Sequence, residues 1–211
     1  AVGYHRPTCR CTASDYRNIL EDRRSSYGQG LVLLNTTSHD EENYDDPFQA
    51  LIRYAAVSTV DGAPMIFYGQ ELGIARYGSF DLYEINFGKL IPQFKKYNSL
   101  QPICNNRGYG VDFLWPVYAA INQARAFSPA LRSSNRYFLN QTATGNPQPY
   151  IFSVAKYEQP NTSPNFSDVV FAFANLDRDH QQQGNFDVNI TRDGGNLFGI
   201  KTGRNYNIKN I

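Results

Sequence analysis

The sequence has few cysteines, no surplus of either charge and no long apolar run. Three cysteines (Cys9, Cys11 and Cys104) are too few for a disulfide framework, and Cys-Arg-Cys lacks the spacing of redox or zinc sites. The 20 Lys+Arg and 19 Asp+Glu form no basic stripe or acidic block, which disfavours nucleic acid and an anionic membrane as partners. No stretch approaches the roughly 20 apolar residues of a membrane span, and the start of the chain lacks signal-peptide order.

Aromatic residues are abundant, with 15 Tyr and 14 Phe beside a single Trp. Tyrosine offers a flat apolar face with a hydroxyl at its rim, which suits contact with sugars, although many tyrosines simply pack at sheet edges. Asn-x-Ser/Thr triplets recur in the sequence and do not establish secretion, so the compartment stays open, with an extracellular or periplasmic one favoured.

The first half of the chain alternates helical and strand patterns. Helical spacing predicts a short amphipathic helix over 14–27, with Ser14 as its N-cap and Gly28 just past its end. The continuous apolar run "LVLLN" (31–35) is typical of a strand covered on both faces, as in parallel sheets. A second apolar run, "PMIFYGQE" (64–71), predicts another buried strand.

Between these strands the sequence predicts a second helix. Asp46 is the expected cap, Pro47 takes the first helical position and Gly62 can end the helix. The expected buried side comprises Phe48, Leu51, Ile52, Ala55 and Ala56.

A strand, a helix and another strand form a βαβ unit, in which the two strands run parallel and end at the same edge of the sheet. In α/β sheets and barrels, functional side chains gather at this carboxyl-terminal edge. The ionisable loop after the first strand and the turn after the second therefore converge there, which makes a candidate site of His39, Asp40, Glu41, Gln70 and Glu71.

The sequence pattern changes near residue 132. Residues 74–110 show no sustained period and predict a long loop with a binding or lid role. Residues 111–127 return to helical spacing, with Pro116 in the first turn. Five apolar-polar segments then predict an antiparallel β domain: 136–140, 150–157, 168–176, 185–190 and 197–201. We therefore divide the chain into residues 1–131 and 132–211.

Four ordered segments resemble glycoside hydrolase family 13, the α-amylase family. "LVLLNTTSHDE" resembles the family's seventh-strand element with its His-Asp pair, and "GAPMIFYGQE" its eighth-strand element. "INQARAFSPAL" (121–131) resembles the end of the last barrel helix, and "VVFAFANLD" a strand of the carboxyl-terminal β-sandwich. The resemblance implies an α/β plus all-β fold, in which the last βα units of a (β/α)8 TIM barrel precede an antiparallel β-sandwich.

The resemblance also implies a retaining glycosidase that acts on α-glucans, in which one carboxylate attacks the anomeric carbon and a second carboxyl group protonates the leaving oxygen. Asp40 matches the family's third carboxylate, which stabilises the oxocarbenium-like transition state, and His39 matches a ligand of the sugar hydroxyls. The family commonly binds calcium, but its usual ligands would lie outside these segments, so no metal is assigned.

The sequence departs from the family in one important respect. Residues 1–30 contain neither the Arg-x-Asp strand motif of the nucleophile nor a strand ending in the acid Glu. A complete barrel needs about 250 residues, whereas only two barrel strands are recognisable here. We therefore expect the chain to need the remaining N-terminal part of the barrel, and to be inactive in hydrolysis alone.

Structural readings of the same residues remain open. His39 and Asp40 could cap a helix, Glu71 and Gln70 could hold the backbone at the rim, Tyr68 could lie in the core, and Arg125 reads as a salt-bridging or snorkelling surface arginine. Two other functional classes also stay open: a noncatalytic α-glucan-binding module that uses the aromatic β domain, and a catalytically dead member of the family with a structural role.

Overall fold

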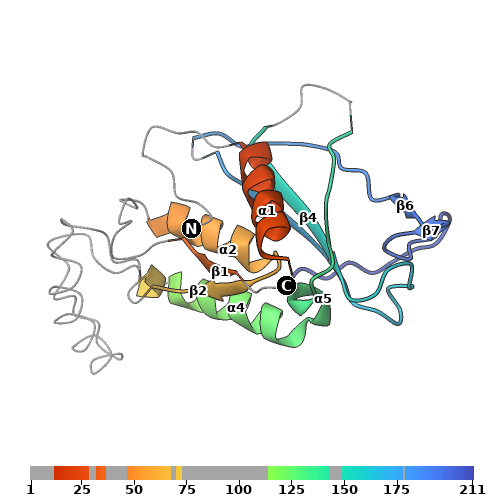
Figure 1. The fold of residues 1–211 in the computed structure, drawn as a ribbon, viewed down its shortest axis with the longest axis horizontal. Coiled ribbons are helices and arrows are strands. Elements are labelled where there is room, and N and C mark those ends of the chain that lie inside the picture. The colour runs from red at the N-terminus through yellow and green to blue at the C-terminus, as the bar shows by residue number, and fades with distance from the viewer. Residues whose placement is uncertain are drawn as a thin grey trace, which may run out of the picture.

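The computed structural model describes residues 12–28, 32–36, 47–67, 70–72, 114–142, 149–177 and 179–211. The long helices lie in the first part of the described chain and the longer strands in the second, where much of the chain is irregular (Figure 1). The elements are α1 (Ala13–Tyr27), β1 (Leu33–Asn35), α2 (Pro47–Ser58), β2 (Ala63–Met65), the 3-10 helix η1 (Gln70–Leu72), α4 (Leu114–Phe127), α5 (Pro129–Arg132), β3 (Arg136–Phe138), β4 (Ile151–Tyr157), β5 (Val169–Asn175), β6 (Thr191–Arg192) and β7 (Gly195–Asn196).

β1 and β2 pair in parallel, with Leu33 opposite Ala63 and Asn35 opposite Met65. The expected strand–helix–strand unit with parallel strands is therefore confirmed. The second strand is shorter than expected, because its pairing with β1 ends at Met65 and Gln70–Leu72 form the 3-10 helix η1. The Gln70 amide donates to the Phe67 carbonyl oxygen at 3.0 Å, and the Gln70 side-chain oxygen accepts from the Phe67 amide at 3.3 Å. These local bonds hold η1 close to Phe67.

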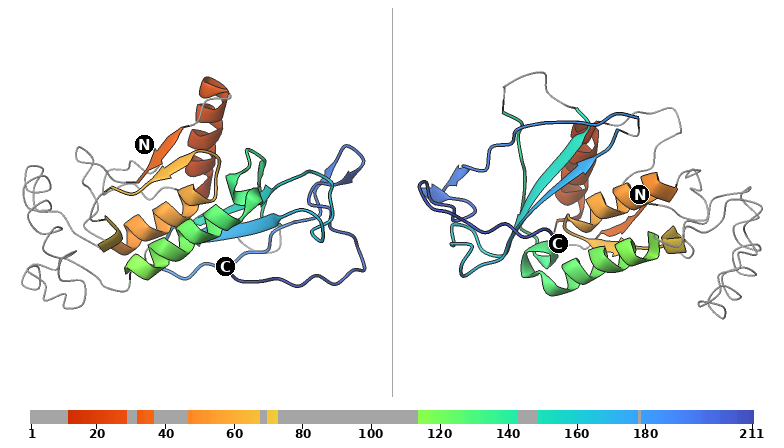
Figure 2. Two further views of the ribbon diagram at one scale, coloured as in Figure 1. Left: turned by 90° about the horizontal axis from the view of Figure 1, so that it is seen from below. Right: turned by 180° about the vertical axis from the view of Figure 1, so that it is seen from behind.

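Among the described residues, elements pack against one face of the β1–β2 pair, and the burial pattern of β1 corrects the expectation of a strand buried on both sides. Leu34 is buried, whereas Leu33 is 55% exposed. α2 packs against both strands and against α4, and Figure 2 shows the two helices lying side by side. Successive side chains of a strand point to opposite faces, so the face with Leu34 meets this helical layer and the face with Leu33 does not.

The N-cap of α1 is Thr12 and not the expected Ser14. The Thr12 hydroxyl accepts from the Asp15 amide at 3.3 Å, and the Thr12 amide donates to the Asp15 carboxylate at 2.8 Å. This reciprocal capping box satisfies donors that a helix start leaves open, which places the cap two residues earlier. The helix ends as predicted at Gly28, whose φ is 55° and whose amide donates to the Arg24 carbonyl oxygen.

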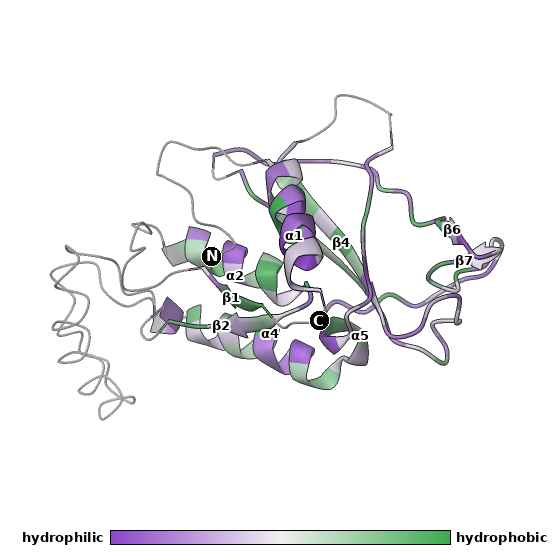
Figure 3. Ribbon diagram, in the orientation of Figure 1, coloured by the Kyte–Doolittle hydropathy of each residue, from purple (hydrophilic) through white to green (hydrophobic). Residues whose placement is uncertain are grey.

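α2 buries a side that overlaps the predicted one only in part, because Leu51 and Ala56 are buried as expected. Phe48 and Ile52 are 47% and 40% exposed, so the expected face is wrong at these positions. The buried side consists of Ala50, Leu51, Tyr54, Ala56, Val57 and Ser58. It includes two polar residues, which a pattern based on apolar residues alone misassigns to the surface. Figure 3 shows the resulting mixture of hydrophobic and hydrophilic segments on α1, α2 and α4.

Gly62 does not end α2, which stops at Ser58. It lies in the turn before β2 with a φ of 134°, a conformation that glycine tolerates and other residues rarely adopt. A β-carbon there would lie 2.7 Å from both Leu34 Cδ1 and the Val32 carbonyl oxygen. Glycine at position 62 therefore allows the close approach of the two strand starts.

β3, β4 and β5 form an antiparallel sheet in that order, which confirms three of the five predicted β segments. The other two segments are not strands. Residues 185–190 contribute only an isolated bridge between Gln141 and Phe186, and residues 197–201 are irregular. A short β6–β7 hairpin lies between them. The β-sandwich itself stays a prediction.

Two hydrophobic clusters stabilise the described residues. The first combines side chains of α1, β1, α2 and α4 with Phe138, Phe152 and Val154 of the antiparallel sheet. The second gathers Tyr157 and Phe198 with further residues beyond position 138. Pro116 lies in the first turn of α4, as predicted. No helix among the described residues is long and apolar enough to cross a membrane.

Candidate functional site

The carboxyl ends of β1 and β2 are joined by the side chain of Gln70. Its amide nitrogen donates to the Thr36 hydroxyl at 2.9 Å and to the Tyr118 hydroxyl at 3.1 Å. Thr36 follows β1 directly, Gln70 lies in η1 after β2, and Tyr118 belongs to α4. The ends of the two strands thus meet through Thr36 and Gln70, and of these two only Gln70 was among the predicted site residues.

We call the carboxyl ends of β1 and β2, where Thr36 and Gln70 meet, the rim. Gln70 has a structural role at this rim. Both hydrogens of its side-chain amide are used, and its oxygen accepts from the Phe67 amide. Gln70 is 7% exposed and Tyr118 is 1% exposed, so neither group is open to a bound molecule. Buried polar groups that are fully hydrogen-bonded fix local geometry. The network therefore sets the positions at which the loops after β1 and β2 begin.

Glu71 lies in η1 next to Gln70, with a partly buried side chain. It brings a carboxylate to the same end of the strands, as the sequence predicted. His39, Asp40, Glu41 and Tyr68 lie outside the described residues, so their roles stay predictions. In the sequence, Asp40 follows Thr36 by four residues.

Two tyrosines connect the rim network to the helices α2 and α4. The rings of Tyr54 on α2 and Tyr118 on α4 lie 5.0 Å apart between centroids, and the Tyr54 hydroxyl donates to Asn122 Oδ1 at 2.6 Å. Burial raises the pKa of the Tyr54 hydroxyl, so this group remains a neutral donor at physiological pH. The contact couples α2 to α4 and hence to the rim network.

Arg125 is a structural residue that sequence analysis misassigned to the surface. Its Nη1 donates to the carbonyl oxygens of Ser58 at 2.7 Å, Val60 at 3.1 Å and Leu131 at 2.9 Å. Its Nη2 donates to the Gly62 carbonyl oxygen at 2.5 Å. Burial lowers the pKa of the guanidinium, which the carbonyl oxygens around it help to stabilise as a cation.

This arrangement joins the end of α2, the turn into β2 and the start of α5 through one side chain. The carbonyl oxygens at a helix end carry partial negative charge and lack partners within the helix. A guanidinium satisfies several of them at once because its five N–H groups spread in one plane. The sequence signal was weak, since a lone arginine near the end of a helix is ordinary.

Among the described residues, no group of three or more His, Cys, Asp and Glu side chains could hold a metal ion, and calcium receives no ligand here. The described part of the site is a rigid rim, formed by two parallel strand ends and held by an amide–hydroxyl network. Comparisons with protein-family models, with curated proteins and with solved structures each find no match.

Proposed function

We propose that this chain is part of a retaining glycosidase of the α-amylase type that acts on α-glucans such as starch, glycogen or maltooligosaccharides. In this proposal the chain supplies Asp40, the carboxylate that stabilises the transition state, and His39, a ligand of the sugar hydroxyls. The nucleophile and the general acid come from residues outside these 211. Without a nucleophile and a general acid, the chain does not hydrolyse glucan by itself.

The observation that carries the proposal is the hydrogen bond from Gln70 to Thr36, at 2.9 Å. It joins the two segments that resemble the family's seventh and eighth strand elements, at the ends from which the His-Asp loop and the Gln-Glu turn continue. Parallel strands that end side by side are the scaffold on which α/β enzymes carry their polar groups. The order and the pairing of these segments both agree with the resemblance.

The uncovered face of β1 also supports the proposal. Leu33 is 55% exposed although it lies between apolar neighbours in the sequence. A two-stranded parallel pair leaves hydrogen-bonding edges on both sides, and such edges favour pairing with further strands. The remaining N-terminal part of a barrel would cover both the edge and this leucine.

The proposed chemistry assigns different tasks to the two residues. As the glycosidic bond breaks, positive charge develops on the sugar ring and the ring flattens. An ionised carboxylate at position 40 accepts hydrogen bonds from the sugar hydroxyls, and these bonds strengthen in the transition state. His39 donates to a hydroxyl and thereby fixes the orientation of the ring.

Maltoheptaose binding to the full chain, measured by isothermal titration calorimetry, tests this assignment. We expect Asp40→Asn to weaken binding by roughly tenfold, since a hydrogen bond to a charged group contributes about 1.5–3 kcal/mol. Asp193→Asn is the matched control, because Asp193 has an 81% exposed carboxylate in the β6–β7 turn. Equal affinities of the Asp40→Asn variant and the unchanged chain would contradict the assignment.

One observation favours the second candidate, a noncatalytic glucan-binding module. Phe173 on β5 is 53% exposed, and its ring lies 5.0 Å from the ring of Phe186 between centroids. Neighbouring aromatic rings on a sheet surface offer apolar faces to which sugar rings can pack. In the same titration, loss of maltoheptaose binding in Phe173→Ser but not in Asp40→Asn would favour the module.

A catalytically dead relative of the family is the third class. In this hypothesis the catalytic residues are missing from segments outside this chain. Glucan binding at the rim therefore does not distinguish an inactive relative from an active enzyme. Reducing-sugar release by a longer protein that carries the upstream strands would separate them, with Asp40→Asn as the inactive control. Release of sugar by the 211-residue chain alone would contradict the proposed division of the catalytic residues.

A further inference from the structure

The dipeptide Asp-Gly occurs twice in the sequence, at 61–62 and at 193–194. At such a pair the backbone nitrogen of glycine can attack the side-chain carboxyl carbon of aspartate. A C–N bond forms, a C–O bond breaks and one water leaves, which produces a five-membered succinimide ring. Glycine favours this ring closure because it has no β-carbon and its backbone adopts many conformations.

Water then reopens the ring at either of its two carbonyl carbons. Opening at one carbon restores aspartate, whereas opening at the other leaves isoaspartate, in which the chain continues through the former side-chain carbon. The steps lose one water and regain one, so the conversion requires no oxidant, cofactor or enzyme. In a folded protein its rate depends on how readily the aspartate side chain and the following peptide group rotate towards each other, which requires local opening.

Asp193 and Gly194 form an exposed turn between β6 and β7, in which Arg192 pairs with Gly195. The φ angles of 52° at Asp193 and 80° at Gly194 are typical of a type I′ turn. The Asp193 side chain is 81% exposed, and Arg192, itself 62% exposed, approaches its carboxylate only to 3.8 Å. A β-carbon added at Gly194 would meet no atom within 4 Å, so the space around the reacting peptide group is open.

The β6–β7 hairpin can open without disturbing the core. It is a two-stranded sheet of two residue pairs, and a ladder of this size is marginally stable in water. The chain is anchored just outside the hairpin, where the Leu197 amide donates to the Ile190 carbonyl oxygen at 2.7 Å. Leu197 is fully buried in the second hydrophobic cluster. Opening of the turn therefore exposes little apolar surface and costs little free energy.

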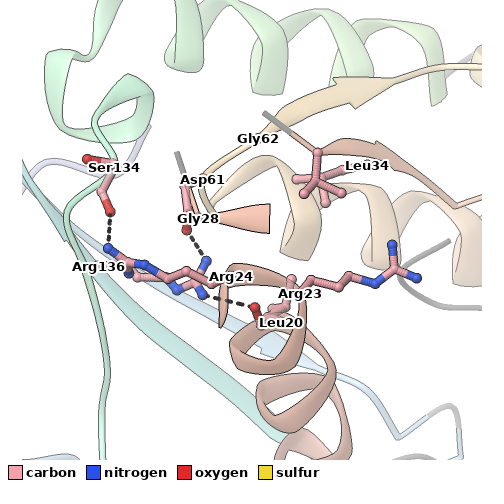
Figure 4. A pocket seen from close by; sticks show the side chains of 10 residues that line it. Leu20, Arg23, Arg24, Gly28, Leu34, Asp61, Gly62, Ser134 and Arg136 are labelled. Carbon is pink, nitrogen blue, oxygen red and sulfur yellow. Dashed lines mark hydrogen bonds and ion pairs between the residues drawn. The ribbon is translucent and has the colours of Figure 1, made fainter. Parts of the chain in front are cut away.

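The second Asp-Gly pair has the opposite surroundings. The Asp61 side chain is 21% exposed and forms an ion pair with Arg136, whose side chain is 2% exposed. Figure 4 shows Asp61, Gly62 and Arg136 around one small cavity, which Arg23 and Arg24 also line. Rotation of the Asp61 carboxylate towards Gly62 would remove a charged partner from a buried guanidinium, which is costly in free energy.

The backbone around Gly62 is held as well. Arg125 Nη2 donates to the Gly62 carbonyl oxygen at 2.5 Å, and the Ala63 amide donates to the Val32 carbonyl oxygen at 2.9 Å. A β-carbon at position 62 would lie 2.7 Å from the same Val32 oxygen, so the turn packs tightly against the start of β1. Rotation of this peptide group therefore requires the two parallel strands to separate, which exposes buried Leu34.

From the exposed turn, its short ladder and the contrast with Asp61, we propose that Asp193–Gly194 is a site of spontaneous isoaspartate formation in the folded protein, and that Asp61–Gly62 is protected. Isoaspartate adds one carbon atom to the backbone at position 193, so the two-residue turn no longer matches the pairing of Arg192 with Gly195. The hairpin therefore opens as the protein ages. It lies on the opposite side of the molecule from β1 and β2 (Figures 1 and 2), and the inference does not depend on the proposed glycosidase function.

The test is prolonged incubation of the full chain at physiological temperature and pH, with the same chain in concentrated guanidinium chloride as the unfolded reference. An endoproteinase that cleaves before aspartate but not before isoaspartate, followed by mass spectrometry, measures the conversion at both positions. In the folded chain we expect Asp193 to convert at least about tenfold faster than Asp61, because its turn opens more readily. In guanidinium chloride the two rates should be similar, so Asp61 is a matched control within the same molecule.

An Asp193→Glu variant tests the consequence for the hairpin, since glutamate would have to close a larger ring and reacts far more slowly. In the unchanged chain a second set of backbone amide signals for Thr191 and Asn196 should appear in NMR spectra at the rate of the conversion, and none should appear in the variant. Undiminished cleavage before Asp193 after incubation of the folded chain overturns the proposal. Equal conversion of Asp193 and Asp61 in the folded chain also overturns it, because the folded surroundings would then not control the reaction.

Discussion

Replacing Arg125 with methionine should destabilise the protein more than a typical single substitution. The change removes four hydrogen bonds from one guanidinium to the carbonyl oxygens of Ser58, Val60, Gly62 and Leu131. Hydrogen bonds to charged groups contribute about 1.5–3 kcal/mol each, but bonds that share one side chain add less than linearly. Because Arg125 is only partly buried, water can reach some of the freed oxygens, and we expect a loss of about 4 kcal/mol.

Urea unfolding followed by circular dichroism measures this loss as a change in the free energy of unfolding. At roughly 2–4 °C per kcal/mol for a chain of this size, the melting temperature should fall by about 8–16 °C. Arg125→Lys keeps the charge but gathers its donors at one point, so it should lose about half as much stability.

Arg132→Met, at an exposed position of α5, is the matched control and should change stability by less than about 0.5 kcal/mol. Equal effects of Arg125→Met and Arg132→Met would refute the proposed role of Arg125 in joining α2, β2 and α5.

Three further predictions concern stability. Gly62→Ala places a β-carbon 2.7 Å from backbone and side-chain atoms at a positive φ, so urea unfolding should show a loss of at least about 2 kcal/mol; an unchanged midpoint would contradict this. Thr12→Ala removes the capping box and should cost about 1 kcal/mol, measured against Ser14→Ala, which should have little effect. Lys156 has a folded pKa of about 8, below its unfolded value near 10.5, so the unfolded chain holds more protons between these values and stability should rise with pH across this window by up to about 3 kcal/mol. Lys156→Met should abolish that rise, and a rise of equal size in the variant would exclude Lys156 as its source.

Local patterns predicted the parallel strand pair and most of the helices, because apolar spacing and turn residues act within a few positions of the chain. The same patterns failed where a contact with a residue distant in the sequence determines whether a side chain is buried. Tyr54 is buried because Asn122 accepts its hydroxyl, and Arg125 is partly buried because a turn more than sixty residues away offers carbonyl oxygens. The sequence around Tyr54 or Arg125 does not identify these distant hydrogen-bond partners.

The β segments show the same limit. Strand β4 is buried along most of its length, so Lys156 lies in the interior on the face of Phe152 and Val154, although a lysine ordinarily lies at the surface. Residues 185–190 alternate as a strand should, yet among the described residues they find only one bridge partner, Gln141. Alternation indicates which residues could pair, whereas the neighbours that are present determine which ones do.

At the candidate site, sequence analysis predicted that the segments after the two strands begin at one edge, since parallel strands that pair must end on the same side, and it named Gln70 but not Thr36. Sequence analysis did not reveal that the side-chain amide of Gln70 is fully hydrogen-bonded within the protein, because one of its partners is Tyr118 of α4. A cavity lined by Arg23, Arg24 and Arg136 was also missed, since these residues come from α1 and β3, which lie more than a hundred residues apart.

The most direct test of the proposed glucan site is an NMR titration of the full chain with maltoheptaose, in which the backbone amides are followed individually. We expect saturable shifts at Thr36 and Gln70, which lie at the carboxyl ends of β1 and β2, and none at Phe173 on β5. Saturable shifts confined to Phe173 and its neighbours, with Thr36 and Gln70 unchanged, would contradict a glucan site at the ends of the parallel strands.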